Sequence, residues 1–181
     1  MQGWQKVHAH PHGGSFQGMM RALRAWVDYE GLGLYINVES AEMRIGHTPG
    51  GKLHLRIPIE GMLRAAPELD TSDHGRPYEG ILYHGTSWSH LAAILTSGCI
   101  LRSSVPTKHK FAIWAGEELY RARMYSPPLA FGNMQLQCIL QILAQRVKAP
   151  HFASDDKQLM LRECWHQVEY LHICEHTGSS S

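Results

Sequence analysis

The segment MQLQCILQILA, residues 134–144, alternates apolar and polar side chains in the way that a half-buried β-strand does. One face would carry Leu136, Cys138, Leu140 and Ile142, and the other would carry Gln135, Gln137, Ile139 and Gln141. One-sided strands of this kind are typical of antiparallel sheets, because helices usually cover both faces of a parallel sheet. The segment therefore predicts a strand that is antiparallel to its neighbour.

The last apolar segment, VEYLHICEH at residues 168–176, predicts a second strand of the same type. Strict alternation would put Glu169, Leu171 and Ile173 on one face and the residues between them on the other. The expected order of elements is strand, helix, strand, helix, strand, strand. A doubly wound parallel sheet would need strict alternation of strands and helices, so this order predicts the α+β class.

The segment GILYHGTSWSHLAAILTSG, residues 80–98, predicts a strand that is followed at once by a helix. Thr86 or Ser87 can cap the start of this helix, and the glycine at the end of the segment can stop it. FAIWA, residues 111–115, predicts the next strand. The helix after it opens with two acidic residues, as the helix dipole favours, and must end before the Pro-Pro pair at 127–128.

The first 75 residues predict an N-terminal α/β extension of unknown role. An irregular arm, a helix, a strand, a hairpin around Thr-Pro-Gly-Gly and a short helix are expected over residues 1–15, 17–30, 31–38, 43–57 and 59–66. A polar segment rich in helix and strand breakers, residues 69–77, marks the expected boundary. The chain would then comprise the extension at 1–75, a main domain at 76–176 and a flexible tail at 177–181.

Charge and cysteine content restrict the classes of partner. The formal net charge of +1 predicts no strong electrostatic footprint for nucleic acid. The four cysteines form no Cys-X-X-Cys pair, which favours an intracellular protein, cytoplasmic or nuclear, over a secreted one with two disulfides. No signal peptide and no apolar run of membrane-spanning length is found, so we expect no membrane partner. His8, His10 and His12 alternate, but their spacing matches no closed zinc site, and we predict no metal.

Three distant segments carry residues that suit a site for a planar, polar ligand. Tyr83-His84-Gly85-Thr86 stands at the exit of an expected strand, where a purely structural turn could use many other residues. Ile113-Trp114-Ala115 precedes the helix that carries Tyr120 and Tyr125, and Glu169 lies at the start of the terminal strand. This ordered set resembles the ADP-ribosyltransferase superfamily, in the branch that includes the poly(ADP-ribose) polymerases.

That family uses a histidine, a tyrosine and a glutamate on three separate strands. Its His-Gly-Ser or His-Gly-Thr motif is matched by His84-Gly85-Thr86. Its Gly-Ile-Tyr-Phe-Ala motif, with a small residue and a tyrosine on the next helix, is similar to residues 112–115 followed by Ala122 and Tyr125. Its Asn-Glu-Tyr motif is similar to Val168-Glu169-Tyr170, and the resemblance covers about residues 78–176.

The resemblance implies a fold and an activity. The fold would be an ADP-ribosyltransferase-like split sheet, mixed or antiparallel, with flanking helices. The activity would be that of an NAD-dependent ADP-ribosyltransferase, which cleaves the bond between nicotinamide and ribose and transfers ADP-ribose to an acceptor. NAD would be the co-substrate, and the acceptor stays open between a protein, a nucleic acid, a small molecule and water.

The resemblance also implies roles for individual residues. Glu169 would bond a ribose hydroxyl and stabilise the oxocarbenium-like centre, and His84 would hold a ribose hydroxyl of the dinucleotide. Gly85 would bond the nicotinamide carboxamide through its backbone, and Tyr125 would stack on the ring. Glu169 and His84 are thus the expected catalytic residues. The expected NAD-binding residues are His84, Gly85, Thr86, Trp114 and Tyr125.

Two residues depart from the family's pattern and keep alternatives open. Trp114 stands where a strand tyrosine is expected, and Arg121 occupies roughly the place of a helix serine. The His-Gly-Thr motif is also similar to the histidine motif of the tRNA 2'-phosphotransferase family. That family uses NAD to remove a phosphate from RNA and needs arginines to bind phosphates. A non-catalytic module that binds NAD, ADP-ribose or a protein is the other alternative. The sequence contains no GxGxxG, P-loop, GxSxG or HExxH motif in a fitting context, which disfavours those enzyme classes.

Overall fold

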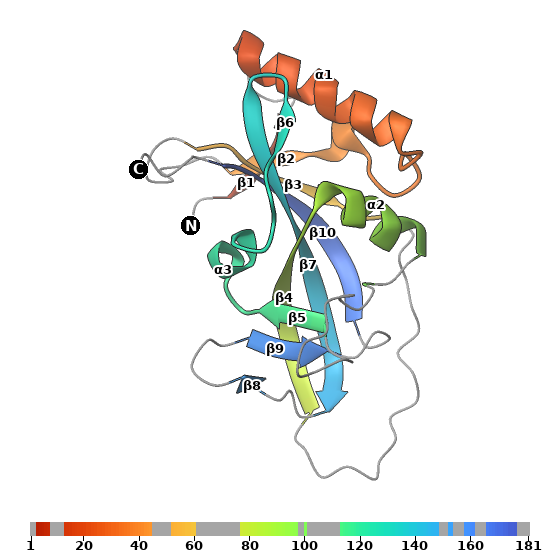
Figure 1. Ribbon diagram of the computed structural model, residues 1–181, viewed down its shortest axis with the longest axis vertical. Coiled ribbons are helices and arrows are strands. Elements are labelled where there is room, and N and C mark those ends of the chain that lie inside the picture. Colours follow the sequence, from red (N-terminus) through yellow and green to blue (C-terminus); the bar gives the residue numbers. More distant parts are fainter. Residues whose placement is uncertain are drawn as a thin grey trace.

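The computed structural model describes residues 3–7, 13–44, 52–60, 77–97, 100, 113–148, 152–153, 158–161 and 166–176. These residues form one sheet of ten strands with three α-helices and a short 3-10 helix (Figure 1). All strand pairs in the described part of the chain are antiparallel. A mainly antiparallel sheet with few helices confirms the expected α+β class.

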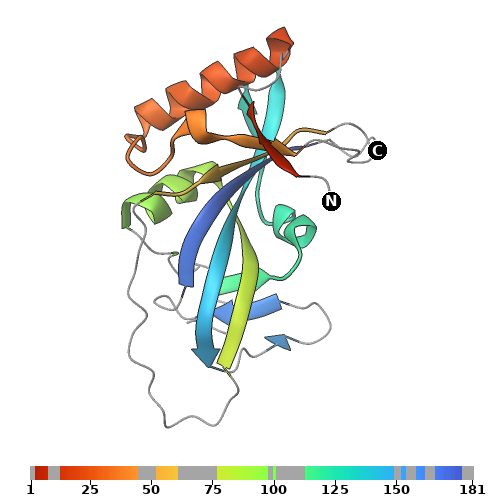
Figure 2. The ribbon, with the colours of Figure 1, turned by 180° about the vertical axis from the view of Figure 1, so that it is seen from behind.

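Three long strands make up the centre of the sheet. They are β10 (His166–Glu175), β7 (Met134–Lys148) and β4 (Pro77–Thr86). On the β10 side follow β3 (His54–Pro58), β2 (Glu42–Arg44) and β1 (Trp4–Lys6). On the β4 side follow β5 (Ile113–Gly116), β9 (Gln158–Leu161) and β8 (Phe152–Ala153), and β6 (Leu129–Phe131) pairs with β7. Figure 2 shows β4, β7 and β10 from behind as adjacent curved strands.

The sheet has two different faces, which we call the core face and the α3 face. Directly paired residues of adjacent strands share a face. Through these pairings Leu82, Leu140 and Leu171 lie on the core face, where α1 (Gly14–Tyr29) and α2 (Trp88–Ser97) complete the main hydrophobic core. On the α3 face, the short helix α3 (Leu119–Arg123) packs through a small apolar cluster that contains Ala122, Ile139, Cys174, Tyr83 and Leu119.

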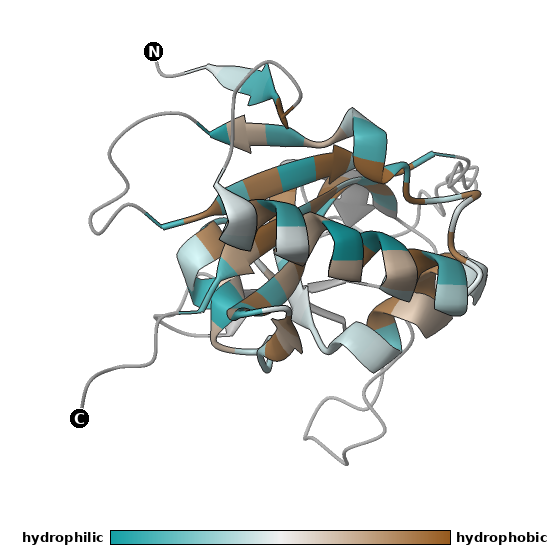
Figure 3. Cartoon of the chain, turned by 90° about the horizontal axis from the view of Figure 1, so that it is seen from above, coloured by the Kyte–Doolittle hydropathy of each residue, from teal (hydrophilic) through white to brown (hydrophobic). Residues whose placement is uncertain are grey.

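The helix α1 covers one end of the sheet with an apolar stripe. Met19, Met20, Leu23 and Val27 are buried, whereas Arg21, Arg24 and Asp28 are exposed. This helical spacing is the signal that predicted the helix over 17–30, and the prediction is confirmed. Figure 3 shows α1 in front of strands that carry many hydrophobic residues. No helix in the described part of the chain is both long and apolar enough to cross a membrane.

The N-terminal part of the chain differs from its prediction in two places. Residues 4–6 form β1, which pairs with β2, so the first 15 residues are not all irregular. The strand expected over 31–38 is wrong. Gly31 ends α1 with a φ of 68°, and the N–H of Ile36 donates to the carbonyl of Leu32, so the chain turns instead of extending. Leu34, which the alternation had placed with Ile36, is 82% exposed.

The predicted hairpin is confirmed in its strands. Glu42 pairs with Arg56 and Met43 pairs with Leu55. Because β3 also pairs with β10, the extension and the main domain share one sheet and one core. Several predictions lie outside the described residues: the histidines at 8, 10 and 12, the turn at 48–51, most of the helix over 59–66, nearly all of the boundary at 69–77, Gly98 and the tail at 177–181.

The second half follows most of its predictions, with three strands that were not expected, β6, β8 and β9. The Ser87 hydroxyl accepts a hydrogen bond from the His90 N–H at 3.2 Å, which confirms the cap of α2. The helix α3 ends at Arg123, before the two prolines, as expected. The sequence analysis missed β6, which forms a hairpin with β7 through Gly132 at a φ of 60°. The Gly-Asn pair at this turn is the signal that could have found it.

Trp88 packs α2 against the core, and its replacement gives a first testable prediction. Its indole N–H donates to the carbonyl of Leu136 at 2.9 Å, and the residue is 3% exposed. We expect Trp88→Phe to lower the free energy of unfolding by about 2 kcal/mol, because a buried acceptor loses its donor and the smaller ring leaves space. Denaturant unfolding followed by circular dichroism measures the change.

Trp26 offers a matched control for this substitution. Its ring packs edge-on against that of Trp88 with centroids 5.0 Å apart, but it is only half-buried. We therefore expect Trp26→Phe to cost less than Trp88→Phe. Equal losses in the two variants would show that the indole hydrogen bond of Trp88 does not matter.

Candidate functional site

Gly85 lies directly beneath α3. A Cβ atom built on Gly85 would lie 1.8 Å from the carbonyl oxygen of Ala122 and 3.2 Å from Cβ of Tyr125. Since real Cβ contacts are never so short as the first of these, only glycine lets α3 pack here. The structure thus brings the glycine of the His-Gly-Thr motif next to the helix and tyrosine of the second motif.

The same contact decides how a ligand could reach Gly85. The space left by the missing side chain is filled by the backbone of α3, so a ligand cannot enter from that face. It could reach the Gly85 backbone from the edge of β4 that faces β5. The ladder between these two strands contains the pair Tyr83–Gly116, and it does not continue to Gly85 and Trp114, although the backbones of both residues are described.

Because the ladder ends after Tyr83 and Gly116, β4 and β5 separate where they carry the His-Gly-Thr motif and the Ile-Trp-Ala segment. In an antiparallel ladder that continued past Tyr83, His84–Thr86 would lie opposite Ile113–Ala115. Among the described pairings, Ile113, Trp114 and Ala115 pair with β9 on the opposite edge of β5, and their edge toward β4 has no ladder partner. Figure 1 shows β5 and β9 running across the direction of β4.

Hydrogen bonds to β7 hold the turn that carries Tyr125. The Ser126 hydroxyl accepts from the Cys138 N–H at 2.8 Å, and the Gln137 amide donates to the carbonyls of Ser126 and Arg123, both at 2.8 Å. Ser126 is 1% exposed, whereas Tyr125 is 56% exposed. The backbone of Tyr125 is therefore held in place, and the residue itself is more than half exposed.

Glu169 is the extra residue of a β-bulge in β10. The register with β7 steps from Val168–Ile142 to Tyr170–Gln141, so two residues of β10 oppose one of β7. The Gln141 amide nitrogen donates to Oε2 of Glu169 at 3.1 Å, which places the carboxylate on the α3 face. Strict alternation had placed Glu169 with Leu171 and Ile173. That expectation is wrong, because the bulge reverses the facing of the residues before Tyr170.

The carboxylate of Glu169 is one end of a series of hydrogen bonds, which we call the Glu169 chain. His54 Nε2 lies 2.9 Å from His172 Nδ1, and His172 Nε2 lies 2.9 Å from Gln141 Oε1. Gln141 and His172 are 7% and 3% exposed. The chain thus connects Glu169 on β10, through β7 and β10 again, to His54 on β3.

Both histidines of the Glu169 chain are held in the neutral form. Burial, with the charges of Arg44, Arg123 and Arg56, lowers the pKa of His54 to about 4. Burial, with His54 and Arg56, lowers the pKa of His172 to about 3. Desolvation disfavours the imidazolium form in each case, and the nearby positive charges disfavour it further.

Aromatic rings enclose this pair of histidines. The Trp4 ring meets His54 edge-on at a centroid distance of 4.9 Å, and the Tyr83 ring meets His172 at 5.7 Å. The Arg56 guanidinium lies 4.5 Å from the centroid of Trp4 and 4.7 Å from that of Tyr170. Its Nε also donates to Glu42 at 2.8 Å. These contacts explain why a cation is tolerated beside the buried His172 and the partly buried His54.

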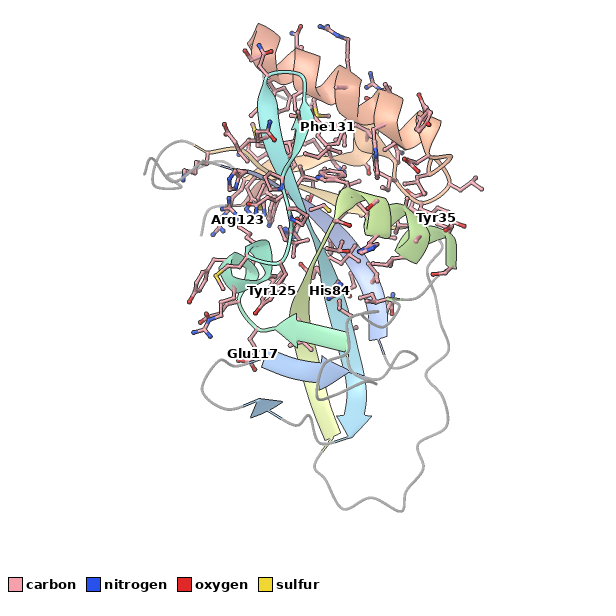
Figure 4. All side chains as sticks on the ribbon, in the orientation of Figure 1. Tyr35, His84, Glu117, Arg123, Tyr125 and Phe131 are labelled. Carbon is pink, nitrogen blue, oxygen red and sulfur yellow. The ribbon has the colours of Figure 1, made fainter. Side chains whose placement is uncertain are left out.

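The other predicted site residues lie elsewhere. His84 pairs with Leu140 and is half-buried on the core face, on the opposite side of β4 from the contact between Gly85 and α3. Figure 4 labels His84 and Tyr125 at a similar height along β4. Thr86 is 5% exposed on the core face. Trp114 is in β5, but its side chain lies outside the described part of the structure.

The structure therefore places Gly85, Tyr125 and Glu169 on the α3 face and His84 on the core face. The sequence analysis missed Gln141, His172 and His54 as members of the site. A signal was present, because the alternation of β7 and β10 placed polar residues such as Gln141 and His172 within a sheet. What the alternation did not show is that these residues hydrogen-bond to one another.

The sequence was compared with protein-family models and with curated proteins. No protein-family model matches the sequence, and a search of curated proteins gave no significant match. The chemistry proposed for the site therefore rests on the residues of this chain.

Proposed function

We propose that the protein is an NAD-dependent ADP-ribosyltransferase with an ADP-ribosyltransferase-like split sheet. The observation that carries the proposal is the end of the β4–β5 ladder after Tyr83 and Gly116. It leaves Gly85 and the Trp114 backbone, which come from two separate motifs, on diverging strands. Nicotinamide has a planar carboxamide that can bond a strand edge, and we place it beside Gly85 in this split.

Tyr125 suits the role of stacking partner for the nicotinamide ring. Its Cβ lies near Gly85, and the residue is more than half exposed. An aromatic side chain on a fixed backbone can cover a flat heterocycle at low entropic cost. The ring and the strand edge would then hold the nicotinamide from two directions.

Glu169 suits the role of the carboxylate that stabilises the reacting ribose. When the bond between C1' and the nicotinamide nitrogen breaks, its electron pair leaves with nicotinamide and positive charge develops on the ribose. A carboxylate that bonds a ribose hydroxyl stabilises this charge. The acceptor then forms a bond to C1' and loses its proton.

The separation of Gly85 and Glu169 fits one nicotinamide riboside. The two residues lie on strands that flank β7, near Ile139 and Gln141. Strand spacings of about 4.8 Å and a rise of about 3.4 Å per residue put their backbones roughly 12 Å apart. Nicotinamide on the β5 side of Gly85 would lie somewhat farther from β10 than Gly85 does, so the glutamate side chain and an extended riboside would together cross β4 and β7. Because His84 lies on the core face, it would contact the rest of the dinucleotide only if NAD passed around the end of β4.

The test of this proposal is nicotinamide release from NAD by purified protein. We expect Glu169→Gln to slow release by at least about tenfold, which corresponds to roughly 1.4 kcal/mol of activation free energy. Glu175→Gln is the matched control, because Glu175 lies on the same strand and its carboxylate accepts from the Leu53 N–H at 3.1 Å. That variant should keep the wild-type rate.

The same assay separates the alternatives. NAD labelled in its ADP-ribose part shows whether a protein, a nucleic acid or water accepts the group. Phosphate loss from a 2'-phosphorylated RNA would favour the phosphotransferase. Against that alternative, Arg121 is paired with Glu118, and Arg123 donates to Gln137 and to the Glu175 carbonyl. NAD binding without nicotinamide release would identify a non-catalytic module.

A further inference from the structure

The hydrogen bonds of the Glu169 chain can be assigned a direction, starting from the carboxylate. An ionised carboxylate only accepts hydrogen bonds, so Gln141 must present its NH2 group to Glu169. The carbonyl oxygen of the same amide then faces His172. Because that oxygen only accepts, His172 must carry a proton on Nε2.

The protonation of His172 determines that of His54. A neutral imidazole with a proton on Nε2 has an acceptor at Nδ1. The contact between His54 Nε2 and His172 Nδ1 therefore requires that His54 donates. Each member of the chain donates toward the next, from His54 to His172, to Gln141 and to Glu169.

Only a neutral His172 supports this direction. A protonated His172 would carry a proton on Nδ1 as well and could not accept from His54. Several ionisable groups surround the two rings from the adjacent strands and from α3. They are Glu42 and Arg44 of β2, Arg56 of β3, Tyr83 of β4, Cys174 of β10 and Arg123 of α3. The cations among them oppose protonation of the rings.

The chain also explains how a bulged residue can keep one orientation. A glutamate side chain has three rotatable bonds, and the register of the ladder does not constrain the extra residue of a bulge. The bond from the buried Gln141 amide fixes Oε2, and the buried His172 fixes that amide. A carboxylate has about four acceptor positions, so acceptor capacity remains for a ribose hydroxyl.

We infer that His54, His172 and Gln141 are positioning residues, which aim the Glu169 carboxylate at the substrate through a one-directional hydrogen-bond chain. This inference rests on the proposed function for its effect on turnover. Its geometry can be tested without NAD.

The first test reads the tautomers directly. Ring ¹⁵N NMR of the full chain at pH 7 should show His172 and His54 neutral, each with its proton on Nε2. A proton on Nδ1 of His172, which includes the imidazolium form of that ring, or a neutral His54 without a proton on Nε2, would overturn the chain. The wild-type protein suffices for this measurement, so it does not depend on any variant folding.

The second test separates positioning from binding. Gln141→Met keeps the volume of the side chain and removes its amide, so we expect kcat for nicotinamide release to fall at least fivefold while KM for NAD changes less than twofold. Gln135→Met is the control, because Gln135 is an exposed residue of the same strand and should keep both constants. An unchanged kcat in Gln141→Met, with an active wild type, would overturn the inference and leave the proposed function standing.

A variant at the far end of the chain covers the case in which Gln141→Met does not fold. His54→Phe keeps a ring against Trp4 and removes the donor to His172. We expect a shift of the His172 Nδ1 resonance and a two- to fivefold lower kcat. An unshifted resonance would contradict the chain. If the wild type releases no nicotinamide, the proposed function is wrong. The tautomers from NMR would then be the only test of the hydrogen-bond chain.

Discussion

Replacing Gly85 by alanine is expected to lower the free energy of unfolding by about 3 kcal/mol, near the upper end of the usual cost of overpacking. The added methyl group would lie 1.8 Å from the Ala122 carbonyl oxygen. That oxygen belongs to the backbone, so it cannot rotate away as the end of a flexible side chain can. Either β4 or α3 must move. Urea unfolding followed by circular dichroism measures the loss.

Gly33 provides the matched control for this prediction. A Cβ built on Gly33 meets no atom within 4 Å, so Gly33→Ala should change stability by no more than about 0.5 kcal/mol. If α3 shifts to make room at position 85, Tyr125 shifts with it, and nicotinamide release should fall as well. A Gly85→Ala protein as stable as Gly33→Ala would show that α3 does not pack on β4 as described.

Acid is expected to destabilise the protein through the two buried histidines. Their pKa values of about 4 and about 3 in the folded state lie below the ordinary value of 6.5. Between those values the unfolded chain binds more protons than the folded one, so stability falls as the pH falls. Between pH 6.5 and pH 5 the loss should be about 1.5 kcal/mol per histidine, or about 3 kcal/mol for both.

Unfolding experiments at several pH values, compared between variants, assign this effect to the pair. His172→Gln removes one of the two groups, so the loss between pH 6.5 and pH 5 should shrink by about half. His90→Gln changes an exposed histidine of α2 and should leave the pH dependence as it is in the wild type. The same pH dependence in His172→Gln and in the wild type would rule out the histidine pair as its cause.

Local patterns in the sequence were enough to find most of the elements. The alternation over residues 134–144 predicted β7 and its two faces, and the spacing of Met20, Leu23 and Val27 predicted α1. Where the pattern was weak, the prediction was wrong. The alternation over 31–38 is also compatible with a turn, and the hydrogen bond from Ile36 to Leu32 shows that the chain adopts one.

The sequence identified the candidate site residues by type, and the structure shows which of them share a face of the sheet. The residue types at 85, 125 and 169 were identified from their motifs, and the structure places all three on the α3 face. The same motifs grouped His84 with them, but alternation along β4 puts neighbouring residues on opposite faces. Since Gly85 faces α3, His84 must face the core.

By itself the sequence determined which of the longer segments become strands and helices, because side chains two or four residues apart already encode which face is buried. Only the tertiary structure decided the bulge at Glu169, the contact of α3 with Gly85 and the hydrogen bonds from His54 to Glu169. Each of these depends on the register between segments far apart in the chain. That register is set by the packing of the whole sheet, which no local pattern contains.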